Sequence, residues 1–66
     1  MNELILDLIN DTRTILLKKY GWLRKAGMHT SMYPVFLSVQ KHWDKAPLKK
    51  IAQLKRFVDD NKDLLQ

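Results

Sequence analysis

The sequence predicts an all-α protein, a small three-helix bundle with up-down-up topology. Apolar residues recur about every 3.6 residues along three stretches, which is the spacing of amphipathic helices. A glycine-containing turn and an Ala-Pro pair separate these stretches. The chain has 66 residues and no cysteine, so packing alone must stabilise a single domain, residues 1–66, with a modest core.

The first predicted helix spans residues 2–26. Its apolar stripe begins at Leu4 and continues to Trp22, which is therefore predicted to belong to the core. Gly27 would then follow the C-cap. An end at Gly21 is the alternative, because an interior glycine costs about 1 kcal/mol relative to alanine. The apolar arc is wider than one neighbouring helix covers, so this helix is predicted to be central or to form half of a homodimer contact.

The second predicted helix spans residues 32–45, with Thr30 or Ser31 as its N-cap. Pro34 falls in its first turn, where a missing N–H does no harm. A second proline begins the third predicted helix, residues 47–65. The expected buried stripes of these two helices comprise Met32, Val35, Phe36, Val39, Trp43, Pro47, Ile51, Leu54, Val58, Asn61 and Leu65.

The order of charges along the chain favours parallel first and third helices. The first helix begins with the acidic residues Glu3, Asp7 and Asp11 and ends with the basic residues Lys18, Lys19, Arg24 and Lys25. The third helix begins with Lys49 and Lys50 and ends with Asp59, Asp60 and Asp63. Parallel helices would bring opposite charges together at both ends, although exposed ion pairs contribute only about 0–1 kcal/mol each.

The composition argues against an enzyme and for an anionic partner. Twelve Lys and Arg outnumber seven Asp and Glu, for a net charge of +5. A chain of this size has little room for an enclosed catalytic pocket. His29 and His42 lack the paired ligand spacing of a metal site, so neither a metal nor a cofactor is expected.

The strongest candidate for function is a basic face around the junction of the second and third helices. Lys49, Ala52, Gln53 and Arg56 are spaced i, i+3, i+4 and i+7, which places them on one side of a helix. Lysine and arginine there would contact phosphates, and the Gln53 amide has the donor and acceptor that read an adenine edge. The predicted nucleic-acid-binding residues are Lys41, Lys45, Lys49, Lys50, Gln53 and Arg56. Asp59 and Asp63 are expected to continue along this side and to limit the basic part to about two turns.

The alternative is a protein-interaction module: an inhibitor, adaptor or assembly factor, of the kind that phages and mobile elements encode. Its surface would be the wide apolar face of the first helix or the aromatic and basic turn near Gly27, since Trp, Tyr and Arg dominate binding hot spots. The predicted partner-binding residues are Leu6, Leu17, Tyr20, Arg24, Lys25 and Tyr33.

No membrane association is expected. The apolar runs are far shorter than the roughly 20 residues of a transmembrane helix. Glu3 and Asp7 interrupt the first apolar stretch, which is unlike a secretory signal. The sequence therefore predicts a cytoplasmic or nucleoid-associated protein.

Overall fold

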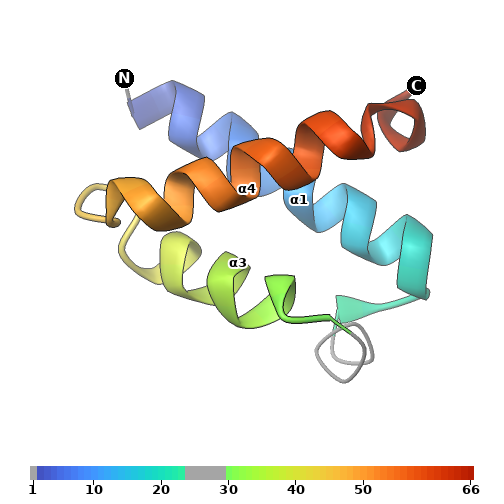
Figure 1. Cartoon of the computed structure of the whole chain (residues 1–66), viewed down its shortest axis with the longest axis horizontal. Coiled ribbons are helices and arrows are strands. Elements are labelled where there is room, and N and C mark those ends of the chain that lie inside the picture. The colour runs from blue at the N-terminus through green and yellow to red at the C-terminus, as the bar shows by residue number, and fades with distance from the viewer. Residues whose placement is uncertain (1, 24–29) are drawn as a thin grey trace.

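The structure, a computed structural model, describes residues 2–23 and 30–66 (Figure 1). Its elements are α1 (Asn2–Tyr20), α3 (Met32–Lys41), α4 (Leu48–Asp60) and a short 3-10 helix, η1 (Lys62–Leu65). Across these two ranges no residue lies in a strand. The all-α prediction is confirmed.

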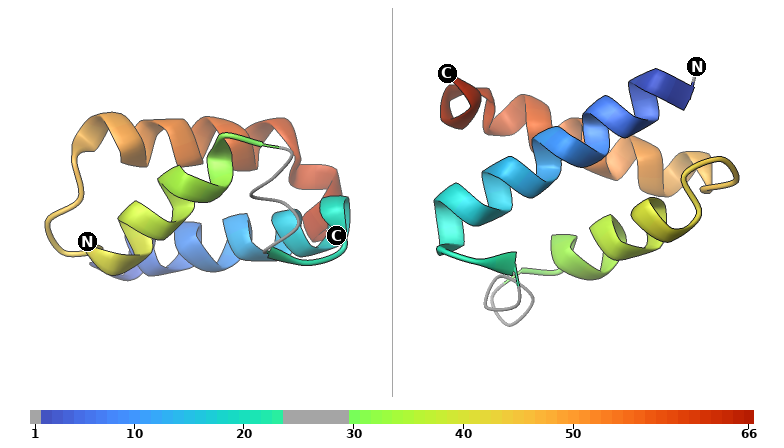
Figure 2. Two further views of the ribbon diagram at one scale, coloured as in Figure 1. Left: turned by 90° about the horizontal axis from the view of Figure 1, so that it is seen from below. Right: turned by 180° about the vertical axis from the view of Figure 1, so that it is seen from behind.

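The helices α1 and α4 cross, and α3 lies across one side of the pair (Figures 1 and 2). The C-terminal end of α1 lies beside η1. Lys18 Nζ donates to the carbonyl of Leu64 at 2.7 Å, and Lys19 Nζ donates to Asn61 Oδ1 at 3.2 Å. These lysines thus bond a carbonyl and an amide instead of the carboxylates that the charge order predicted.

The predicted continuation of the first helix past Gly21 is wrong. Gly21 has φ +90°, and its N–H donates to the carbonyl of Leu17 at 2.8 Å. A glycine reaches this left-handed conformation without the steric cost that a Cβ imposes, and it ends helices for that reason. Lys18 and Lys19 therefore occupy the last turn, where they complement the helix dipole. The predicted C-cap glycine, Gly27, lies outside the described residues.

The helix α3 begins as predicted but ends four residues early. The hydroxyl of Thr30 accepts the N–H of Met32 at 3.1 Å, while the Ser31 side chain makes no capping bond. Pro34 lies in the first turn. At the other end, the residues predicted to form a last helical turn, 42–45, form turns, and the His42 N–H bonds the Ser38 carbonyl at 3.1 Å.

The helix α4 is bounded by Pro47 and Asn61, so the predicted helix 47–65 is interrupted. The Pro47 carbonyl accepts the N–H groups of Lys50 and Ile51, at 3.0 and 3.1 Å. The Asn61 side chain donates to the Phe57 carbonyl at 2.8 Å. Local side-chain bonds of this kind compete with helical ones, and the chain continues as η1.

The core lies where the three α-helices meet. Its buried apolar residues are Leu8, Ile9, Ile15, Leu16, Phe36, Val39, Leu54 and Val58. Thr12 is also fully buried, and its hydroxyl donates to the Leu8 carbonyl at 2.7 Å. Three residues of the predicted stripes are not in the core: Trp22 is 51% exposed because it follows the helix end, Leu4 is 72% exposed, and Pro47 is exposed at the start of α4.

Candidate functional site

The outer side of α4 carries three of the predicted nucleic-acid-binding residues. Lys49, Gln53 and Arg56 are all exposed, at successive turns of the helix. The core residues Leu54 and Val58 occupy other sides of α4. The predicted spacing therefore does place these polar groups together, facing solvent.

The remaining three predicted residues come from the α3–α4 junction. Lys50 Nζ donates to Ser38 Oγ at 3.0 Å, which ties the first turn of α4 to α3. Lys41, one turn beyond Ser38, and Lys45, in the following turn, are both exposed. We call these six residues, Lys41, Lys45, Lys49, Lys50, Gln53 and Arg56, the basic face.

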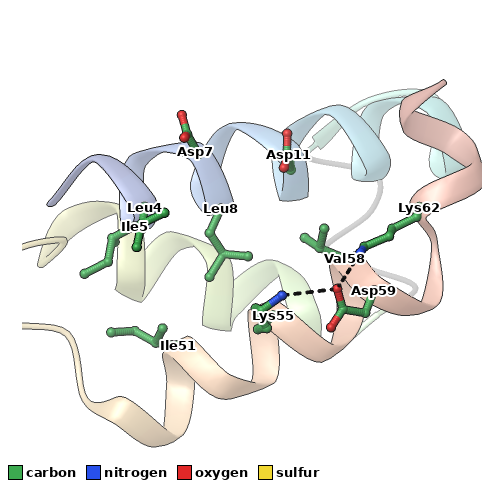
Figure 3. Close-up of a pocket in the computed structure, with 10 residues that line it drawn as sticks. All are labelled: Leu4, Ile5, Asp7, Leu8, Asp11, Ile51, Lys55, Val58, Asp59 and Lys62. Carbon is green, nitrogen blue, oxygen red and sulfur yellow. Dashed lines mark hydrogen bonds and ion pairs between the residues drawn. The ribbon is translucent and has the colours of Figure 1, made fainter. Parts of the chain in front are cut away.

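Asp59 lies one turn beyond Arg56 on α4, and its carboxylate is paired with two lysines. Lys55 Nζ and Lys62 Nζ each lie 3.4 Å from Asp59 Oδ1 (Figure 3). Partial desolvation acts to raise the pKa of Asp59, but the hydrogen bond and charge of Lys55, and then those of Lys62, outweigh it. The pKa of Asp59 is consequently lowered from its ordinary value of 3.8.

A groove of about 410 Å³ lies between the N-terminal half of α1 and α4 (Figure 3). Its apolar floor consists of Leu4, Ile5, Leu8, Ile51 and Val58. Its α1 rim carries Asp7 and Asp11. Its opposite rim, the α4 rim, carries Lys55 and Asp59 of α4 and continues to Lys62 of η1. We call this the α1–α4 groove.

A second hollow of about 410 Å³ adjoins the α1–α4 groove and shares Leu4, Ile5 and Ile51 with it. Its other lining residues are Trp43, Asp44, Ala46 and Leu48. Leu48 is 83% exposed at the first position of α4. The two hollows thus form one continuous apolar surface.

Sequence reasoning missed this surface. Leu4 fits the helical stripe, but the stripe does not reveal that the neighbouring helices diverge at this end of α1. Periodicity shows which side of a helix is apolar, but not which part of that side a neighbouring helix covers, so the sequence held no signal for this surface.

The predicted partner-binding residues differ in how far they are exposed. Leu6 and Leu17 are exposed on α1. Tyr20 and Tyr33 are half-buried against the core, and Tyr33 stacks on Phe36 with ring centroids 6.4 Å apart. Arg24 and Lys25 lie outside the described residues.

Other kinds of site find no support in the described ranges, 2–23 and 30–66. No three His, Cys, Asp or Glu side chains are grouped there to hold a metal ion. None of the helices there has both the length and the apolar character needed to cross a bilayer. No protein family, curated protein or solved structure matches the chain.

Proposed function

We propose that this protein is a small non-enzymatic accessory or regulatory protein that associates with nucleic acid through the basic face. The observation that carries the proposal is the exposure of Lys49, Gln53 and Arg56 on one side of α4. Ammonium and guanidinium groups arranged in this way would replace condensed counterions along a phosphate backbone. A cytoplasmic or nucleoid-associated location belongs to the same proposal.

The position of the carboxylates supports this proposal. Asp59, one turn beyond Arg56, is paired with Lys55 and Lys62 beside the α1–α4 groove, so its charge is partly neutralised. Asp60 is the carboxylate at the end of the outer side of α4. The positive charge therefore runs from Lys41 to Arg56, as the sequence spacing predicts, and ends at the carboxylates that follow Arg56.

Fluorescence anisotropy with labelled duplex DNA, single-stranded DNA and duplex RNA tests the proposal. We expect binding at low salt that weakens steeply as salt rises, with the logarithm of affinity falling linearly against the logarithm of salt concentration. The variant Lys49→Glu/Arg56→Glu should bind at least about tenfold more weakly and show a smaller salt slope.

Arg13→Glu is the matched control, because Arg13 is an exposed cation on α1, away from the basic face. It changes the net charge in the same direction and should alter binding much less per substitution. Absence of binding to all three probes at low salt, or equal losses per charge from both variants, would overturn the proposal.

The alternative function, a protein-interaction module, is favoured by the exposure of Leu6 and Leu17 on α1, at 46% and 38%. Such a module would form a complex that resists moderate salt and is weakened by Leu6→Ser or Leu17→Ser. Pull-down from a lysate at several salt concentrations separates this function from nucleic-acid binding. We also propose that the three helices form an up-down-up bundle and that the protein can form a homodimer.

A further inference from the structure

The geometry points to the α1–α4 groove and its adjoining hollow as the contact between two copies of this chain, related by a twofold axis that runs along the groove. This inference does not rest on nucleic-acid binding. On α4, the groove residues Ile51, Lys55 and Val58 lie about half a turn from Lys49, Gln53 and Arg56. The two surfaces can therefore act independently, and each can fail independently.

The helix α3 covers only one side of the α1–α4 pair. The bond from Lys50 to Ser38 marks the covered side of α4. The other side is the α1–α4 groove, and in Figure 3 α3 lies behind the residues that line it. There the apolar floor continues to Leu4 and Leu48, which are 72% and 83% exposed. The exposed leucines of one copy could therefore pack into the hollow of another copy, which is how apolar residues fill the centre of an interface.

The two rims of the α1–α4 groove carry opposite charge. Asp7 and Asp11 make the α1 rim negative, and within the part of the chain that the structure describes neither forms an ion pair. On the α4 rim, Lys55 and Lys62 share the single carboxylate of Asp59, so that rim keeps a positive charge. The groove is thus acidic on one side and basic on the other.

This asymmetry selects the occupant and the axis. A twofold axis along the groove exchanges the rims, so the α1 rim of each copy faces the α4 rim of the other. The surface is then complementary to itself, as a symmetric contact between identical copies requires. An axis across the groove would instead place like rims together, where the charges repel.

The available surface is consistent with such a dimer. A stable interface takes about 800 Å² from each partner, which is roughly a sixth of the 4807 Å² surface of this chain. The groove and its adjoining hollow would supply the apolar centre of such an interface, and the two charged rims would supply its border. Oligomerisation is also a common way for a chain of this length to supplement a modest core.

Sedimentation equilibrium over a wide range of protein concentration is the first experiment. We expect a reversible dimer, and Leu4→Ser/Leu48→Ser should raise its dissociation constant about tenfold or more. Both side chains are largely exposed, so the substitution leaves the fold intact, which circular dichroism checks. Leu37→Ser is the control, because Leu37 is an exposed leucine on α3, away from the groove, and should leave the dimer unchanged.

Charge reversal tests the axis. Asp7→Lys/Asp11→Lys makes both rims basic, whereas Lys55→Glu/Lys62→Glu makes both rims acidic. Each variant alone should dimerise more weakly than the wild type. An equimolar mixture should form a heterodimer in preference to either homodimer, because both rim contacts then join opposite charges.

Three results would overturn the inference. A monomer at every concentration would show that no second copy occupies the groove, which would leave a helix of another protein as its occupant. A dimer that Leu4→Ser/Leu48→Ser leaves intact would place the contact elsewhere. Charge variants that each dimerise as tightly as the wild type, with no preference for the heterodimer in the mixture, would exclude the axis along the groove.

Discussion

Lys50 on α4 donates a hydrogen bond to the hydroxyl of Ser38 on α3, with 3.0 Å between Nζ and Oγ. The bond links two helices that are joined by a short turn, and both residues are half-buried. It also anchors one member of the basic face. The ammonium group of Lys50 is thereby held at the α3–α4 junction, between the helices that carry the exposed residues Lys41 and Lys49.

Removing this bond should cost a modest amount of stability. We expect Ser38→Ala to lower the free energy of unfolding by about 0.5–1.5 kcal/mol, the usual net contribution of one hydrogen bond. Urea denaturation followed by circular dichroism measures the change. Lys49→Ala is the control on the exposed side of α4 and should stay within about 0.5 kcal/mol. Equal effects of both substitutions would show that the Lys50–Ser38 bond does not stabilise the α3–α4 junction.

Gly21 should not tolerate a Cβ without loss of stability. Its φ of +90° is the constraint, since a Cβ built there would meet no atom within 4 Å. We expect Gly21→Ala to destabilise the protein by about 1–2 kcal/mol through backbone strain. Gly21→Asn should cost less, because asparagine adopts the left-handed region more readily. Thermal denaturation of the two variants checks the order, and a reversed order would contradict it.

Leu54 should be among the residues on which the fold depends most. It is fully buried where α4 meets the other helices. Leu54→Ala should lower the free energy of unfolding by about 2–5 kcal/mol, a large share of the stability of a domain this small. The control Leu37→Ala removes the same atoms from a 42% exposed position and should cost far less. Similar unfolding midpoints for the two variants would contradict the position of the core.

The ion pairs of Asp59 predict a small pH effect. Because the pKa of Asp59 is lower in the folded protein than its ordinary 3.8, its charge favours folding above that value. This contribution is lost as the pH falls through the lowered pKa. Asp59→Asn should therefore be less stable than the wild type at neutral pH and equally stable once the carboxylate is protonated. Both side chains of the Lys55 pair are exposed, so the neutral-pH difference should also shrink at high salt.

The pairing of Asp59 can be checked directly by titrating the carboxyl carbons by NMR. The Asp59 signal should move at a lower pH than it does in Lys55→Ala/Lys62→Ala. An unchanged midpoint in that variant would show that the two lysines do not act on this carboxylate.

Much of the fold followed from local patterns. The periodicity around Phe36, Val39, Leu54 and Val58 predicted buried residues, and all four are buried. The helix ends were predicted less well. At Gly21 the apolar stripe continued beyond the helix, and at Asn61 a side chain replaced a helical bond, so competition between local bonds decided the boundary in both places.

The sequence also predicted part of the basic face, namely which of its residues share one side of α4. The spacing of Lys49, Gln53 and Arg56 already placed these residues on one side of a helix, away from the apolar stripe. The partners of the neighbouring charges were not predictable. The side chain of Lys50 reaches α3, and Asp59 pairs with Lys62 of η1, because the chain turns at places that periodicity does not specify.

The sequence by itself determined that the chain forms three amphipathic helices, which sides of them are apolar, and that it carries a positive charge of +5. Only the tertiary structure decided which part of each apolar side is covered. Leu4 and Leu16 belong to the same stripe of α1, yet Leu16 is fully buried and Leu4 is largely exposed. The reason is geometric: crossed helices are closest at their crossing and diverge toward their ends, and α3 fills the space on only one side.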